Sequence, residues 1–182
     1  YNNFLGEKES SIHVETIKRD GTLRILNKGY AVETNDNMLI ITTIDSLLRR
    51  QPPKFSTAKI LKIDTDGYDL KIIRGGIDFL KKNKPVLFFE YDRFYLDAVS
   101  DDGLSIFDTL KKLNYHSVLF YDNYGRFLLS TFLTQKEKIA QLDAYISNKK
   151  GAFPYYDLCI FHGEDEDIAC QFIDEELSIN KK

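Results

Sequence analysis

The sequence predicts an α/β domain, and three observations support this fold class. Apolar strands alternate with amphipathic helices from residue 58 onward, as is typical of β-α-β units. A β-rich segment precedes them. A chain of 182 residues is also the size of one domain and can bury a continuous core. We therefore expect one domain over residues 1–182, with a β-rich segment and a short helix at 1–57 and an α/β portion at 58–182.

The first part of the chain predicts a hairpin or meander. Residues alternate in polarity from Ile12 to Ile17, Asp20-Gly21 marks a turn, and the chain returns over Thr22 to Leu26. A further strand is predicted over Met38 to Thr43 and a short helix over Asp45 to Arg50.

A strand-helix-strand unit follows. A strand over Lys59 to Ile63 leads into a helix that carries apolar residues at helical spacing from Leu70 to Leu80, and a strand over Val86 to Glu90 comes next. Two strands joined in this way are expected to be parallel, with a right-handed crossover.

The rest of the chain continues the alternation. The expected elements are a helix at 104–113, a strand at 117–121, a short strand at 126–129, a helix at 134–148, a strand at 156–161 and an acidic helix at 165–177.

Composition excludes several classes of function. A net charge of −3 and a pI near 5.7 argue against a nucleic-acid partner, which would require a basic face. Two cysteines, Cys159 and Cys170, fit a reducing compartment and are expected in the core. The apolar runs are too short to cross a bilayer and no signal peptide opens the chain, so we expect a cytoplasmic protein without a membrane partner.

Acidic residues stand where two predicted parallel strands end. Asp64 ends one strand and Glu90 the next, so their carboxylates should reach the same edge of the sheet, on strands about 5 Å apart. For Asp64 a functional role is favoured, because a buried strand seldom ends in an acid without a partner. Asp66 and Asp69 are more simply explained as caps of the following helix.

Two other interpretations of these acids and their neighbours stay open. A divalent metal held by Asp64, Asp66 and Glu90 suits carboxylate chemistry, but the spacing is no metal signature and no metal is assigned. The residues from Tyr91 to Tyr95 could line an acceptor pocket or be partly buried with wetted hydroxyls. The three histidines are dispersed, which argues against a triad or a zinc site.

Several segments together resemble a known family. They are Asn3-Phe4-Leu5-Gly6, Thr42-Thr43-Ile44-Asp45, Lys62-Ile63-Asp64-Thr65-Asp66-Gly67-Tyr68-Asp69-Leu70, Ile73-Arg74-Gly75 and Pro85-Val86-Leu87-Phe88-Phe89-Glu90. Their order and spacing are similar to the FkbM-type methyltransferase family, whose hallmark is a strand ending Lys-Ile-Asp-Val-Glu-Gly-Ala-Glu. The resemblance covers residues 3 to about 92.

The resemblance implies a Rossmann-like, class I methyltransferase fold that uses S-adenosylmethionine to methylate a hydroxyl of a sugar or other small metabolite. An antiparallel closing hairpin would be formed by 117–121 and 156–161. Asp64 would lie near the cofactor and the transferred methyl group, and Asp64, Asp66 and Glu90 would be the catalytic carboxylates, with Asp64 or Asp66 as general base. A small molecule or a glycan would be the acceptor.

The chain departs from the family pattern in two ways. Asp66 replaces the usual Glu. The glycine-rich turn that holds the cofactor has no counterpart, since Gly75-Gly76 lies within a predicted helix, and we expect that turn upstream of Tyr1. The fold would then be incomplete at its N-terminus, with an unpaired edge at Lys59 to Ile63 that favours association into oligomers. The isolated chain should bind S-adenosylhomocysteine weakly or not at all.

Two alternatives to an O-methyltransferase remain. One is a non-catalytic fragment or degenerate Rossmann-like module that serves packing or protein contacts. The other is a nucleotide-sugar-binding domain of a glycosyltransferase, which would explain paired acids but not the Thr42-Thr43-Ile44-Asp45 segment.

Overall fold

The computed structural model describes residues 3–19, 22–27, 38–50, 55, 57–147 and 153–179. The strands are β1 Phe4–Leu5, β2 Ser10–Arg19, β3 Thr22–Asn27, β4 Met38–Thr42, β5 Ile60–Ile63, β6 Val86–Asp92, β7 Tyr115–Asp122, β8 Phe127–Phe132 and β9 Tyr155–His162. The helices are α1 Ile44–Arg50, α2 Asp69–Arg74, α3 Ile77–Asn83, α4 Arg93–Ala98, α5 Ser105–Lys112, α6 Lys136–Ser147 and α7 Glu166–Ile179, with a 3-10 turn, η2, at Gly163–Asp165. The predicted mixed α/β structure is confirmed.

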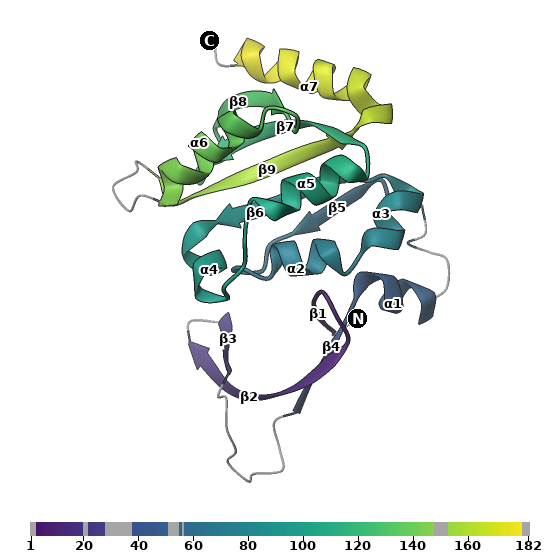
Figure 1. Cartoon of the computed structure of the whole chain (residues 1–182), viewed down its shortest axis with the longest axis vertical. Helices are drawn as coiled ribbons and strands as arrows, with labels where there is room; N and C mark the ends of the chain where they lie inside the picture. The colour runs from purple at the N-terminus through teal and green to yellow at the C-terminus, as the bar shows by residue number, and fades with distance from the viewer. Residues whose placement is uncertain are drawn as a thin grey trace.

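A small sheet forms the N-terminal part of the structure, at the bottom of Figure 1. Its strand order is β1-β4-β2-β3, and β2 pairs antiparallel with β3 as the predicted hairpin. β4 lies between β2 and β1 and is parallel to β1. The predicted turn at Asp20-Gly21 lies outside the described residues.

A five-stranded sheet forms the centre, in the order β5-β6-β9-β7-β8. β5 and β6 are parallel, which confirms the predicted strand-helix-strand pairing, and the other neighbours are antiparallel. The expected pairing of 117–121 with 156–161 is present as β7 against β9, although the hairpin itself joins β7 to β8. Among the described residues β5 has no second strand partner, so it is an edge strand as expected.

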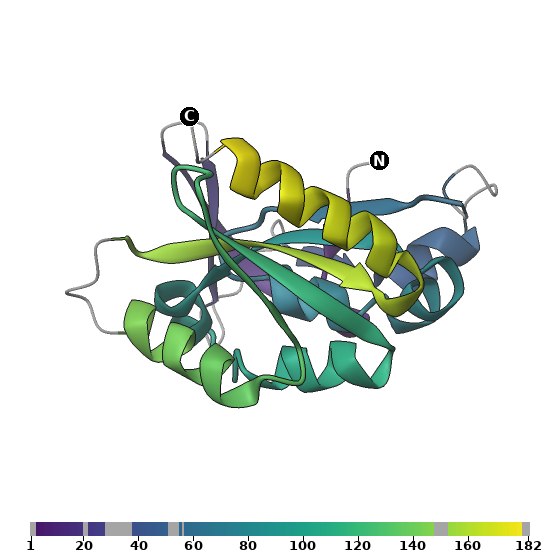
Figure 2. The same cartoon turned by 90° about the horizontal axis from the view of Figure 1, so that it is seen from above.

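Helices pack on both faces of this sheet (Figure 2), with α7 on one side and α5 and α6 on the other. Side chains of β6 alternate between two cores: Leu87 and Phe89 enter the larger one, whereas Val86 and Phe88 pack against the smaller one under α7. Cys159 lies in this smaller core as predicted, but Cys170 is exposed on α7, so its predicted core position is wrong.

One predicted helix is divided in two. The apolar pattern from Leu70 to Leu80 predicts a continuous helix, but α2 ends at Arg74 and α3 begins at Ile77. A Cβ on Gly75 would lie 2.1 Å from the carbonyl oxygen of Gly6, so only glycine allows the N-terminal segment to approach here. The break between the helices therefore falls at two glycines, Gly75 and Gly76, and a tertiary contact requires the first of them. The short helix α4 was not predicted.

Candidate functional site

The carboxyl ends of β5 and β6 place the two predicted strand-end acids side by side. Ile63 pairs with Phe89 in the parallel register, so Asp64 stands opposite Glu90. Ile63 and Phe89 both enter the main core, and the alternation of a strand turns the next residue to the opposite face. The prediction that Asp64 and Glu90 are neighbours on two parallel strands is confirmed, but β6 continues to Asp92, so the prediction that Glu90 ends its strand is wrong.

The loop between β5 and α2 has a tightly specified backbone. Asp66 has φ 48° and Gly67 has φ 99°, so two successive residues adopt positive φ. Asp tolerates this conformation better than most residues, and Gly adopts it freely. A Cβ on Gly67 would lie 2.6 Å from the Cβ of Tyr95 on α4, so the loop packs closely against that helix. The positions of Asp64 and Asp66 are thus constrained by a turn that needs glycine.

Asp64 and Asp66 are both exposed at this site. The Asp64 carboxylate lies 3.2 Å from the Lys62 ammonium group, and the two side chains are 62% and 61% exposed. The expectation that Asp64 ends a buried strand is therefore wrong, since its partner is a solvated lysine on an edge strand. Asp66 makes no side-chain hydrogen bond within the described residues and does not cap α2, whose N-cap residue Tyr68 has no side-chain bond.

Asp69 is the buried member of the acidic group, at 1% exposure. Its Oδ2 accepts hydrogen bonds from the backbone N–H of Thr65 (3.3 Å) and the hydroxyl of Thr65 (2.7 Å). Its Oδ1 accepts from the backbone N–H of Glu90 at 3.4 Å. Asp69 thus connects the loop after β5 with β6, and its prediction as a simple helix cap is wrong.

Glu90 is the most perturbed carboxyl group of the site. Burial, together with the negative charges of Asp69, Asp92, Asp64 and Asp66, raises the pKa of Glu90 to about 8. Desolvation and like charges both disfavour the ionised form. Glu90 therefore holds its proton near neutral pH and releases it slightly above, which suits a group that exchanges protons with a substrate.

β9 adds an acid that the sequence did not assign to the site. Asp157 is the direct cross-strand partner of Glu90, and burial and the charge of Asp64 raise its pKa. Tyr155, two residues earlier on the same strand, also has its pKa raised by burial and by the charge of Glu90. Alternation along β9 alone could have placed Asp157 on this face, but only the strand order places it beside Glu90.

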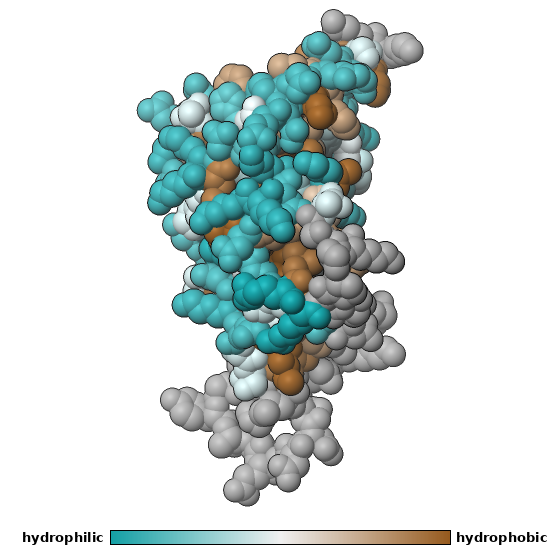
Figure 3. Space-filling view, turned by 90° about the vertical axis from the view of Figure 1, so that its right-hand side faces the viewer, coloured by the Kyte–Doolittle hydropathy of each residue, from teal (hydrophilic) through white to brown (hydrophobic). Residues whose placement is uncertain are grey.

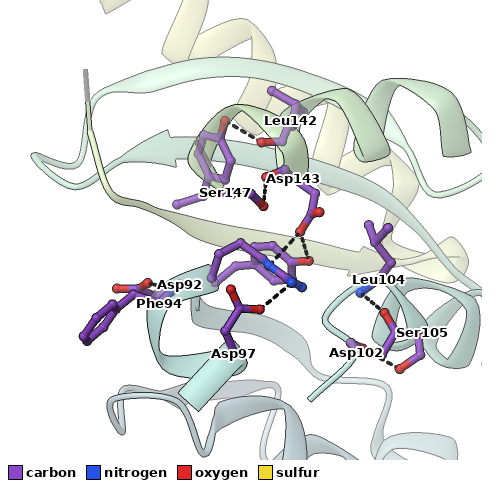
Figure 4. A network of polar contacts seen from close by, with 12 residues as sticks. Asp92, Phe94, Asp97, Asp102, Leu104, Ser105, Leu142, Asp143 and Ser147 are labelled. Atoms are coloured by element: carbon purple, nitrogen blue, oxygen red, sulfur yellow. Dashed lines mark hydrogen bonds and ion pairs between the residues drawn. The ribbon is translucent and has the colours of Figure 1, made fainter. Parts of the chain in front are cut away.

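Two of the residues that follow Glu90 contact α6 instead of lining an acceptor pocket. The Tyr91 hydroxyl donates a 2.6 Å hydrogen bond to Asp143 Oδ1 on α6, and the Tyr91 side chain is buried in the main core. Arg93 lies 3.7 Å from the same carboxylate. Figure 4 shows Asp143 within this network, with Asp92 and Phe94 set apart from it. Tyr91 and Arg93 therefore connect β6 to α6, and the interpretation that they line a pocket is wrong.

Asp92 has two roles at the end of β6. Its Oδ1 accepts a 2.7 Å hydrogen bond from the backbone N–H of Phe94 and caps α4. Burial raises the pKa of Asp92, and its negative charge is one of those that act on Glu90.

A cavity of about 560 Å³ lies along β5, from Ile60 to Thr65. Apolar side chains of β5 and of the helices α1, α2 and α3 line most of it, including Ile44, Ile72 and Phe79. Asp64 and Thr65 line the part nearest the acids. In the space-filling view, hydrophobic residues gather in the middle of one face, next to the grey atoms (Figure 3). Asp64 therefore borders an apolar hollow, whereas Glu90 is not among the residues that line it.

Two further features of the described residues bear on function. Among them, no group of three or more His, Cys, Asp or Glu side chains is arranged to hold a metal ion. Within the same residues, none of the helices has the length and apolar character needed to cross a membrane.

Other motif residues support the fold around the site. The Asp45 carboxylate accepts 2.9 Å hydrogen bonds from the backbone N–H groups of Asp78 and Phe79, and so caps α3. The Thr43 hydroxyl accepts one from Ser46 at the start of α1. The Thr42-Thr43-Ile44-Asp45 segment therefore supports the two helices beside the cavity rather than contributing to the acidic group.

Comparison with known proteins gives one match. The sequence model of the methyltransferase FkbM domain matches residues 16–117, which include β5, the acidic loop, α2 and β6. No curated protein and no solved structure matches the chain.

Proposed function

Since the chain belongs to the FkbM methyltransferase family, we propose that it is an S-adenosylmethionine-dependent O-methyltransferase acting on a hydroxyl of a sugar or other small metabolite. The observation that carries this proposal is Glu90. It is a half-buried carboxyl group with a pKa of about 8, beside a loop that presents Asp64 and Asp66. A hydroxyl group loses its proton as its oxygen is methylated, and a carboxylate with a raised pKa is a better proton acceptor than an ordinary one.

The carboxylates have separate tasks in this proposal. Glu90 accepts the proton of the acceptor hydroxyl. Asp64 and Asp66, which are exposed on the loop, accept hydrogen bonds from further hydroxyl groups of a sugar or similar acceptor and orient it. Holding the acceptor in one orientation can contribute about 7 to 11 kcal/mol to the lowering of the barrier.

The site residues fit one end of the proposed cofactor. When bound, S-adenosylmethionine supplies an electrophilic methyl group on a positively charged sulfur. Carboxylates at the strand ends favour a nearby positive charge, and Asp64 at the border of the cavity is the residue that would face it. The chain has ten glycines, and no two of them are separated by three residues as in the glycine-rich turn that the family resemblance implies, so these 182 residues offer no such turn for the rest of the cofactor.

The test is transfer of a labelled methyl group from S-adenosylmethionine, using the protein as its gene encodes it and a panel of sugars and hydroxylated metabolites. We expect transfer that rises as the pH passes through about 8. E90Q should lower the rate by at least about 100-fold, the usual effect of losing a general base. E137Q is the control, since Glu137 is exposed at the start of α6, away from the site.

The competing proposal is a non-catalytic module that retains the sheet for packing or protein contacts. The departure from the glycine pattern of the family favours it, whereas the perturbed Glu90 favours the enzyme. Calorimetric titration of the protein as its gene encodes it with S-adenosylhomocysteine distinguishes the two. A protein that binds no S-adenosylhomocysteine and methylates no acceptor would be the module.

A further inference from the structure

Asp69 joins the two parts of the proposed site. The residue lies in the first turn of α2, yet its hydrogen bonds go backward to Thr65 and across to Glu90. Thr65 lies between Asp64 and Asp66 in the loop after β5. One carboxylate therefore holds the loop with one oxygen and β6 with the other.

Burying the Asp69 carboxylate costs folding free energy, and an exposed helix cap would not carry this cost. A carboxylate at 1% exposure loses its hydration, and burial raises the pKa of Asp69 even though its hydrogen bonds act in the opposite direction. Its charge also opposes that of Glu90. A helix start needs neither cost, because an exposed Ser, Thr or Asn satisfies the same N–H groups.

We propose that Asp69 is a positioning residue, which uses the Thr65 hydroxyl to hold the Asp64 and Asp66 loop at a fixed distance from Glu90. This inference rests on the proposed function, in which these carboxylates bind one acceptor. An acceptor hydroxyl can then reach Glu90 only while its neighbouring groups meet the loop. Loosening this connection by about 1 Å is enough to reduce catalysis strongly.

Thr65 offers a test that leaves all charges in place. T65V removes the hydroxyl and keeps the shape of the side chain, whereas T65S keeps the hydroxyl. The readout is the titration of the Glu90 carboxyl group, followed by carbon NMR in the protein without substrate. The groups that act on or directly oppose Glu90 are Asp64, Asp66, Asp69, Asp92, Tyr155 and Asp157.

We expect T65V to lower the Glu90 titration midpoint by about one pH unit, because the released loop admits water and so reduces the desolvation that raises the pKa of Glu90. T65S should keep the wild-type midpoint. D69N should lower the midpoint too, since it removes the charged neighbour with the largest effect. T109V is the matched control, because it removes a 3.1 Å hydroxyl bond to Ser105 within α5, away from the site.

A purely structural role gives a different result. T65V would then lower the melting temperature and leave the Glu90 midpoint at its wild-type value, which would overturn the inference. The charge-neutral T65V decides the question even if D69N does not fold.

Methyl transfer separates this inference from the function it rests on. In an active enzyme, T65V should lower kcat by about tenfold or more and change KM less, and T65S should restore it. If the wild-type protein transfers no methyl group while the T65V titration shifts as expected, the proposed function fails and the positioning stands. If transfer is normal and the titration does not move, only the positioning fails.

Discussion

At the scale of single residues, Glu90 makes the stability of the protein depend on pH. Its pKa is raised from 4.5 to about 8 on folding. Between these values the folded state keeps a proton that the unfolded chain has released, so the free energy of unfolding falls as the pH rises. E90Q cannot ionise and should lose this part of the pH dependence.

Urea unfolding at about pH 5 and about pH 8.5 measures this effect. Wild type should lose more stability than E90Q between the two pH values, and E90Q should be the more stable protein at the higher one. The other buried acids titrate in both proteins, so their contribution cancels in the comparison. The exposed E137Q should follow wild type. Equal pH dependence of wild type and E90Q would contradict the raised pKa.

The sequence predicted Asp64 and Glu90 as neighbours because parallel strands end at one edge, a rule that needs no coordinates. It did not predict Asp157, whose place beside Glu90 depends on β9 lying next to β6. The sequence did not predict the hydrogen bonds of Asp69 either. An acid at this position can cap a helix or connect two segments, and the sequence does not distinguish these roles. The parallel pairing of neighbouring strands was thus predictable from the sequence, whereas side-chain hydrogen bonds and the partner from the distant strand β9 were not.

At the scale of elements, the strands and most helices follow from local patterns, but their interruptions follow from contacts. The break between α2 and α3 falls at Gly75, where the backbone of Gly6 approaches too closely for any side chain. The short helix α4 is capped by Asp92, which the sequence analysis considered only as a possible pocket residue. Hydrophobic periodicity cannot detect either feature, because each involves a backbone group rather than an apolar face.

The cap that Asp45 provides for α3 predicts a measurable loss of stability. Asp45 accepts hydrogen bonds from two N–H groups of the first turn, so D45A should destabilise the protein by about 1 kcal/mol. In a chain of this size that corresponds to a fall of about 2 to 4 °C in melting temperature. Thermal unfolding of D45A against D174A, which changes an exposed acid on α7, checks this. A melting temperature of D45A equal to that of D174A would show that the cap contributes no stability.

At the scale of the whole molecule, the order of the central sheet could not be read from the sequence. The predicted strands were correct in number and position from β5 to β9, and the parallel pair and the antiparallel closing pair are present. The insertion of β9 between β6 and β7 brings the chain back across the sheet, and long-range pairing of this kind leaves little local signal. The same topology leaves β5 at the edge.

The open edge of β5 predicts association of the 182-residue chain. Among the described residues, β5 pairs on one side only, its Ile60 side chain is 69% exposed, and an apolar cavity runs beside it. Such an edge is a template for another strand, and a lysine placed on it opposes pairing. Light scattering over a range of concentrations should show a mass that rises above the monomer in wild type and stays closer to it in I60K.

I40K is the matched control, since Ile40 is 71% exposed on β4, which has strand partners on both sides. A wild-type chain that stays monomeric at every concentration, or an I40K variant that dissociates as readily as I60K, would show that the β5 edge does not drive association.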